Sequence, residues 1–263
     1  MIDNLFFVHL VLAFAVGSLW VTIITVIAEK RGSMVGGVLG GLPSTSAFSF
    51  FFIALNQSTA VAVEATTVFP LAFGITIAFL LLYAFFTQRG FGKGLTVSLF
   101  VWFALSAIIV MLGVRNFVIS LVAGISISIL TYFGFTRTLR LQNLEGEPKL
   151  YRIRDVLLRG IGAGSLVLLS VLVSQFGGPV LGGIAAAFPA VFISTLIILN
   201  NSRGTEFSRA MTKPLAICGI LTIIPYCVAV HFLYTATGVW FGTLTSYFIV
   251  VPLAFLSYRL SRK

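Results

Sequence analysis

Long uninterrupted apolar runs are the feature that most constrains what this chain can fold into. Of its 263 residues, 59% are hydrophobic and 9% are charged, and the mean hydropathy is +1.09. Globular domains in water carry about 25% charged residues, so this chain lacks the polar side chains that would cover a water-exposed surface. A helical run of about 20 apolar residues matches the thickness of a bilayer. We therefore expect an all-α polytopic membrane protein.

The runs predict about nine transmembrane helices separated by short loops. The predicted spans are 5–28, 34–55, 62–87, 94–113, 116–136, 156–175, 179–200, 210–234 and 236–259. Lys and Arg follow the first, third, fifth, seventh and last spans, whereas the other loops contain a single cation, Arg115. Because positively charged loops stay in the cytoplasm, this alternation predicts an outside N-terminus and a cytoplasmic C-terminus. The expected location is the plasma (inner) membrane of a prokaryote.

The chain also contains an internal repeat, which shows in three pairs of similar segments in the same order. The pairs are 17–19 with 164–166, 36–43 with 182–189, and 70–75 with 214–220. They predict a first four-helix repeat over 1–114, a linker helix with a basic cytoplasmic loop over 115–155, and a second four-helix repeat over 156–263. Because one helix separates the two units, the second unit would enter the membrane from the opposite side. Inverted repeats of this kind are typical of secondary transporters.

The second unit carries a family resemblance. Its Gly-rich segment ending in Pro189, its loop Asn200-Asn201-Ser202-Arg203-Gly204 and its run Ile223-Ile224-Pro225-Tyr226 resemble the GlpM-like family of small four-helix bacterial membrane proteins. The first unit keeps the Gly/Pro segment but lacks the Arg-Gly loop and the proline of the later run. The resemblance implies a fused, inverted pair of such units and implies no substrate.

The second and seventh spans hold the candidate substrate site. Each contains a proline in mid-span, which removes a backbone donor and frees carbonyls that hydrocarbon cannot satisfy. Two broken helices could bind a solute through such carbonyls and nearby hydroxyls. The alternative is that the glycines form close helix contacts and the hydroxyls bond back to their own helix. The candidate residues are Gly40, Gly41, Pro43, Ser44, Thr45, Ser46, Ser49, Gly183, Pro189, Ser194 and Thr195.

Charged residues suggest two further surfaces at the membrane boundary. Glu64 and Arg115 on the outer side could pair or flank an entrance, or could simply be solvated interface residues. Four arginines near the cytoplasmic face could bind anionic lipid headgroups, although orientation of the spans alone would explain them. These arginines are Arg137, Arg140, Arg152 and Arg154.

The remaining patterns exclude several functions. No phosphate-binding loop, zinc motif or Ser/His/Asp arrangement can be assembled, so we expect no enzyme, no metal and no cofactor. The net charge of +10 reflects loop cations, and we expect no nucleic-acid partner. The leading function is transport of a small uncharged or zwitterionic solute, or of an ion, between the two broken helices. An ion channel, a lipid flippase or scramblase, and a non-transporting membrane scaffold are the alternatives.

Overall fold

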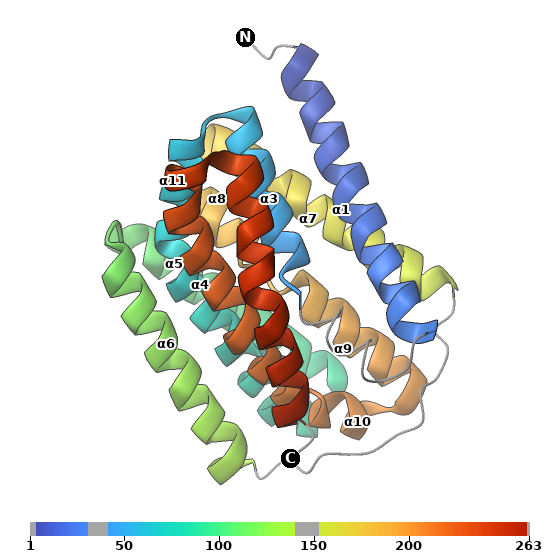
Figure 1. The fold of residues 1–263 in the computed structure, drawn as a ribbon. Coiled ribbons are helices and arrows are strands. Elements are labelled where there is room, and N and C mark those ends of the chain that lie inside the picture. The colour runs from blue at the N-terminus through green and yellow to red at the C-terminus, as the bar shows by residue number, and fades with distance from the viewer. Residues whose placement is uncertain (1–3, 31–41, 140–152, 262–263) are drawn as a thin grey trace.

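The computed structural model describes residues 4–30, 42–139 and 153–261, and every element in these ranges is helical. Seven helices there are long and apolar enough to cross a membrane, which confirms the all-α prediction. Figure 1 shows them as a bundle. In chain order, the helices of the structure begin with α1 (Asn4–Lys30), α3 (Ser44–Asn56), α4 (Thr59–Phe86), α5 (Phe91–Leu112), α6 (Phe117–Phe133) and α7 (Ile153–Gly177). The others are α8 (Pro179–Ala186), α9 (Ala190–Arg203), α10 (Thr205–Ala210) and α11 (Thr212–Ser261), with single turns at Thr87–Arg89 and Gly134–Thr138.

The last helix is a hairpin. Its backbone leaves the helical region at Gly238, where φ is 77° and ψ is 176°, a conformation that favours glycine. The two arms then pack against each other: Tyr234 and Thr243 share a hydrogen bond of 2.8 Å between their hydroxyls, and the rings of Tyr226 and Tyr247 lie 5.2 Å apart. The apolar stretch Thr205–Ser257 therefore folds back on itself at the boundary predicted between the last two spans.

Two predicted spans are not continuous helices. The expected helix 34–55 is described from Leu42 onward, and its helical part, α3, starts only after Pro43. The expected helix 179–200 is divided into α8 and α9 around Pro189. In both cases a described helix, α3 or α9, begins directly after a proline, which cannot donate to the preceding turn. The count of about nine helices stays a prediction, because α3 alone has 13 residues and is too short to cross a bilayer.

The outer helices α5 and α6 bury mainly small and polar residues and expose large apolar residues. On α5 the buried positions are Gly94, Ser98, Trp102 and Ser106, while the ring of Phe100 is 73% exposed. α6 repeats the pattern with Ser120, Gly124 and Ser128 inside. This is the reverse of a water-soluble helix and is typical of helices that pack in lipid.

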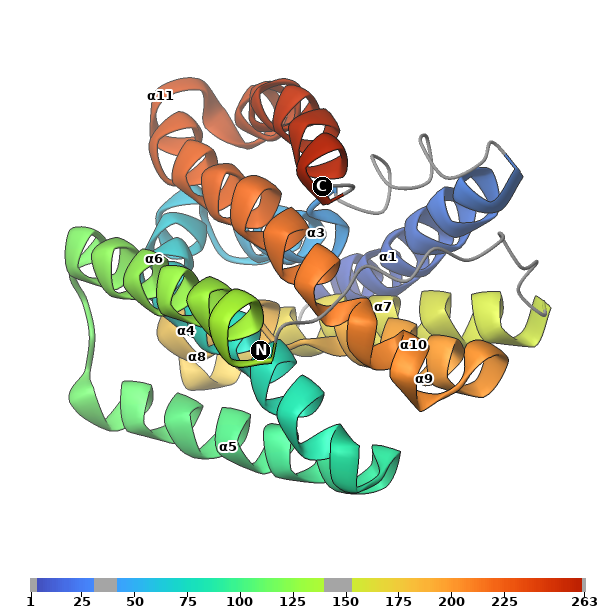
Figure 2. The ribbon, with the colours of Figure 1, turned by 90° about the horizontal axis from the view of Figure 1, so that it is seen from below.

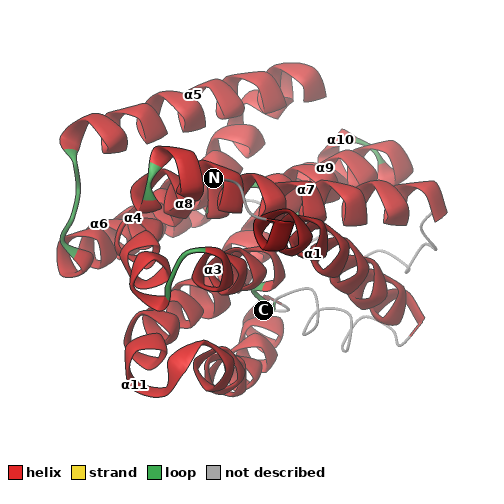
Figure 3. Cartoon of the chain, turned by 90° about the horizontal axis from the view of Figure 1, so that it is seen from above, coloured by secondary structure: helices red, strands yellow, loops and turns green. Residues whose placement is uncertain are grey.

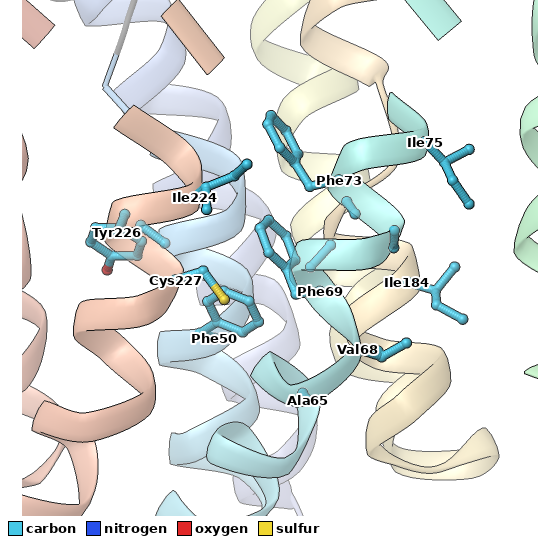
Figure 4. Close-up of a cluster of buried hydrophobic side chains, with 14 of the residues drawn as sticks. Phe50, Ala65, Val68, Phe69, Phe73, Ile75, Ile184, Ile224, Tyr226 and Cys227 are labelled. Carbon is cyan, nitrogen blue, oxygen red and sulfur yellow. The ribbon is translucent and has the colours of Figure 1, made fainter. Parts of the chain in front are cut away.

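Helix α4 forms the centre of the bundle. Of its most apolar window, 72% is buried, against 22% for α5 and for α6. Figures 2 and 3, from below and from above, show the other helices around it. In Figure 4 its Phe69 and Phe73 point toward Phe50 of α3 and toward Ile224 and Cys227 of α11. This apolar cluster connects α4 to both halves of the chain.

Candidate binding cavity between two broken helices

The two breaks share one local geometry. Pro43 has φ −75° and ψ 64°, and Pro189 has φ −75° and ψ 32°. At each proline, the N–H of the following residue donates a hydrogen bond to the carbonyl of the preceding residue. Ser44 N donates to Leu42 O, and Ala190 N donates to Phe188 O, both at 2.8 Å. Each proline is thus the centre of an inverse γ-turn that opens directly into a helix.

Both breaks line the same cavity. Its volume is about 60 Å³, and it is partly open. Its walls come from α1, α3, α4, α7, α8, α9 and α11 and from the segments before α3 and between α8 and α9. The lining residues are Val21, Ile24, Thr25, Leu42, Pro43, Ser44, Thr45, Ser46, Phe69, Phe73, Thr76, Arg159, Ala186, Ala187, Phe188, Pro189, Val191, Phe192 and Ile223.

The carbonyl freed at the second break is satisfied by a side chain from α4. Thr76 Oγ1 donates to Ala187 O at 2.6 Å and accepts a hydrogen bond of 2.8 Å from Trp102 Nε1. Thr76 is 1% exposed and Trp102 is 3% exposed, so this chain of bonds is buried. A buried unpaired carbonyl would be costly, and the Thr76 hydroxyl removes that cost.

Five of the predicted site residues meet at the cavity. They are Pro43, Ser44, Thr45, Ser46 and Pro189. The first three residues of α3 therefore form one wall, and the start of α9 forms the facing one.

Four other candidates lie elsewhere. Ser49 is fully buried one turn further along α3, but it does not line the cavity. A Cβ on Gly183 would collide with the carbonyl of Ala65, so Gly183 serves a close contact between α8 and α4. Ser194 and Thr195 both donate to Val191 O of their own helix. Gly40 and Gly41 lie outside the described residues.

The described residues of the predicted charged surfaces, Glu64, Arg115, Arg137 and Arg154, are exposed. Glu64 and Arg115 are both described, and no ion pair joins them. Arg137 lies over the ring of Phe133, and Arg154 approaches Asp155 at 3.9 Å. Arg140 and Arg152 lie outside the described residues. The entrance and the lipid-binding surface stay predictions.

Three polar residues of the cavity were missed by the sequence analysis: Thr25, Thr76 and Arg159. Arg159 lines the cavity from α7. Thr25 donates a hydrogen bond to Val21 O of its own helix, and Thr76 donates one to Ala187 O. Their spacing along the chain carries no signal, because contacts between distant helices bring them together.

The part of the chain that the structure describes holds no group of three or more His, Cys, Asp or Glu residues that could bind a metal. Both histidines stand apart from the cavity lining. His231 is bonded to the Thr66 hydroxyl at 2.8 Å and is stacked on Phe117 with ring centres 3.8 Å apart.

The repeated segments lie against each other. A Cβ on Gly17 would lie 3.2 Å from the Cα of Gly164, its counterpart in the repeat. A Cβ on Gly219 would lie 3.0 Å from the ring of Phe73, and both belong to the third pair of segments. The second pair supplies the two prolines of the cavity.

Comparison with known protein families found a match in the second half of the chain. Residues 156–260 match DUF3147, a family described as a protein of unknown function. The match falls within the second unit predicted from the repeat, 156–263, and the division into two repeats stays a prediction. Comparison with curated proteins and with solved structures found no match. The second half of the chain is thus similar to DUF3147.

Proposed function

We propose that this chain is a membrane transporter built as an inverted repeat, in which a small solute or ion passes through the cavity between the two broken helices. The observation that carries the proposal is that Pro43 and Pro189 line one cavity with the same turn geometry. Broken helices that meet near the middle of a membrane are the usual substrate sites of inverted-repeat transporters. We propose no catalytic activity.

The contacts between repeated segments support this architecture. Equivalent elements related by a twofold axis meet their own counterparts at that axis, as in a symmetric dimer. Gly17 meets Gly164 at the crossing of α1 and α7, and the segment around Phe73 meets the segment around Gly219. An inverted repeat, with two units joined by α6, accounts for all three pairs together.

The ends of the bundle support the proposed orientation. Gln57 bonds to Ser174 at 3.0 Å, and both lie at ends predicted to face outside. Tyr83 bonds to Ser208 at 2.6 Å, and both lie near ends predicted to face the cytoplasm. At each of these two contacts, the helix ends that meet are ones predicted to lie on the same side of the membrane. With the positive-inside rule, we propose that the C-terminus is cytoplasmic and that the protein lies in a prokaryotic inner membrane.

Swelling of liposomes tests the proposal. Purified protein is reconstituted, and light scattering follows entry of small neutral solutes, zwitterions and salts of equal osmolarity. We expect at least one of them to enter faster than in protein-free liposomes. Pro43→Ala and Pro189→Ala should each reduce this entry at least about tenfold, because alanine lets the helix continue across the break.

Pro252→Ala is the control, because Pro252 lies inside the continuous second arm of α11, is exposed and does not line the cavity. It should transport normally. A parallel assay follows loss of a fluorescent lipid from the outer leaflet. Lipid movement without solute entry would replace the transporter with a scramblase, and conductance at channel rates would replace it with a channel. If none of these assays detected movement of solute, ion or lipid, the results would favour a non-transporting membrane scaffold.

A further inference from the structure

Two uncapped helix N-termini face the cavity. α3 begins at Ser44 and α9 at Ala190, and neither has a side chain that bonds its free N–H groups or an acidic residue in its first turn. The residue at each N-cap position is a proline, which offers no side-chain acceptor. The first turn of a helix carries unpaired N–H groups and about half a positive charge. Thr45 and Ser46 of α3, and Val191 and Phe192 of α9, bring both of these ends to the cavity wall.

The cavity is also lined by a positively charged side chain, which has the same sign of charge as the helix N-termini. Arg159 of α7 is part of the lining, and none of the described lining residues is Asp or Glu. The remaining walls are mainly apolar, with four Phe rings from α4 and from the second break. Low polarity around the site strengthens the attraction between these positive groups and a negative ligand.

A buried hydroxyl without a partner lies at the same place. Ser46 is 3% exposed and lines the cavity, yet its Oγ has no hydrogen-bond partner among the described residues. Ser98 and Ser128, by contrast, donate to the carbonyl four residues earlier, while Ser49 also lacks a partner there but does not line the cavity. An unpaired buried hydroxyl is costly, so a ligand that accepts its proton would be stabilised there.

We infer that the cavity binds a small anion, or the anionic group of a small solute, between the N-termini of α3 and α9, with the Ser46 hydroxyl as a donor. Backbone N–H groups at a helix N-terminus bind such groups readily. The inference rests on the proposed function, because it names the substrate class of the same cavity. It narrows that class to negatively charged substrates.

Thermal unfolding of the purified protein in detergent tests the inference without any transport. Sodium chloride, sodium phosphate and sodium acetate are titrated separately, and lithium and potassium chloride serve as the cation series. We expect saturable stabilisation by at least one anion, independent of the cation. Saturation with acetate alone would indicate a carboxylate of an organic solute, whereas saturation with chloride or phosphate would indicate an inorganic anion.

The matched variants are Ser46→Ala and Ser49→Ala. Both remove a buried hydroxyl without a partner from α3, but only Ser46 lines the cavity. Ser46→Ala should weaken the apparent anion affinity about tenfold, as expected for one hydrogen bond to a charge, and Ser49→Ala should bind as the unchanged protein does. The unfolding temperatures without salt show that both variants fold.

The inference is overturned if no anion gives a saturable response, if only the cation matters, or if both variants respond alike. Failure of the proposed function gives a different result. Anion binding without flux in liposomes would support the anion site and contradict the proposed transport function. Flux of neutral solutes or cations without anion binding would support transport and contradict the anion site.

Discussion

Single glycines decide how closely the helices of this chain approach one another. Gly164 lies where α7 crosses α1, and a Cβ there would collide with Phe14 O and Ser18 Oγ. Phe14 O is a backbone atom, so it cannot move aside without shifting α1. On the same helix, Gly162 is exposed, and a Cβ there would meet nothing within 4 Å.

Gly164→Ala should therefore destabilise the protein by about 1–3 kcal/mol, the usual cost of overpacking a close contact. Gly162→Ala should be neutral or stabilise by up to about 1 kcal/mol, because alanine favours the helix more than glycine does. Thermal unfolding in detergent measures both. Equal unfolding temperatures for the two variants would show that α1 and α7 do not meet at Gly164.

At the scale of elements, a hydrogen bond from a residue of α4 stabilises the break between α8 and α9. The Thr76 hydroxyl lies between Ala187 O and Trp102 Nε1, and it connects three helical elements. The carbonyl and the indole N–H are polar groups in an apolar interior, so each needs this partner.

Thr76→Val keeps the shape of the side chain and removes the hydroxyl. Both remaining partners would then be buried without hydrogen bonds, and we expect a loss of about 1–3 kcal/mol in stability. Thr245→Val is the control, because Thr245 is half-buried and its hydroxyl donates to Phe241 O and Gly242 O of its own helix. If chemical unfolding gave the same stability for both variants, the bridge would contribute nothing to the break.

At the scale of the whole molecule, the direction of the bundle in the membrane follows from its loops. Thr237 lies beside the turn at Gly238, and Gln88 lies between α4 and α5, and both are exposed. The proposed orientation places these residues on opposite faces.

A cysteine at Thr237 should react with an impermeant maleimide added outside intact cells, whereas a cysteine at Gln88 should react only after permeabilisation. Both are introduced after Cys218 and Cys227 are replaced by alanine. The opposite pattern would invert the proposed orientation, and labelling of both positions from outside would contradict the inverted repeat.

Local features of the structure could be predicted from the sequence because their causes act within a few residues. Apolar runs predicted the long helices, and Pro43 and Pro189 predicted the two breaks, since each proline removes a donor from its own turn. The repeat predicted that these breaks are related. Ser44, Thr45 and Ser46 followed because they come directly after Pro43.

The rest depended on which faces of distant helices meet. Ser49 and Ser46 are one turn apart on α3, yet only Ser46 lines the cavity, and composition offers no way to choose between them. Thr76 meets Ala187 across 111 residues of sequence, and Arg159 joins the cavity through the packing of α7. The sequence by itself determined helices, breaks and repeat, because these arise from local hydrogen bonding and apolar length. Only the tertiary structure decided that two positive helix ends and an arginine share one cavity, because that requires contacts between helices far apart in the chain.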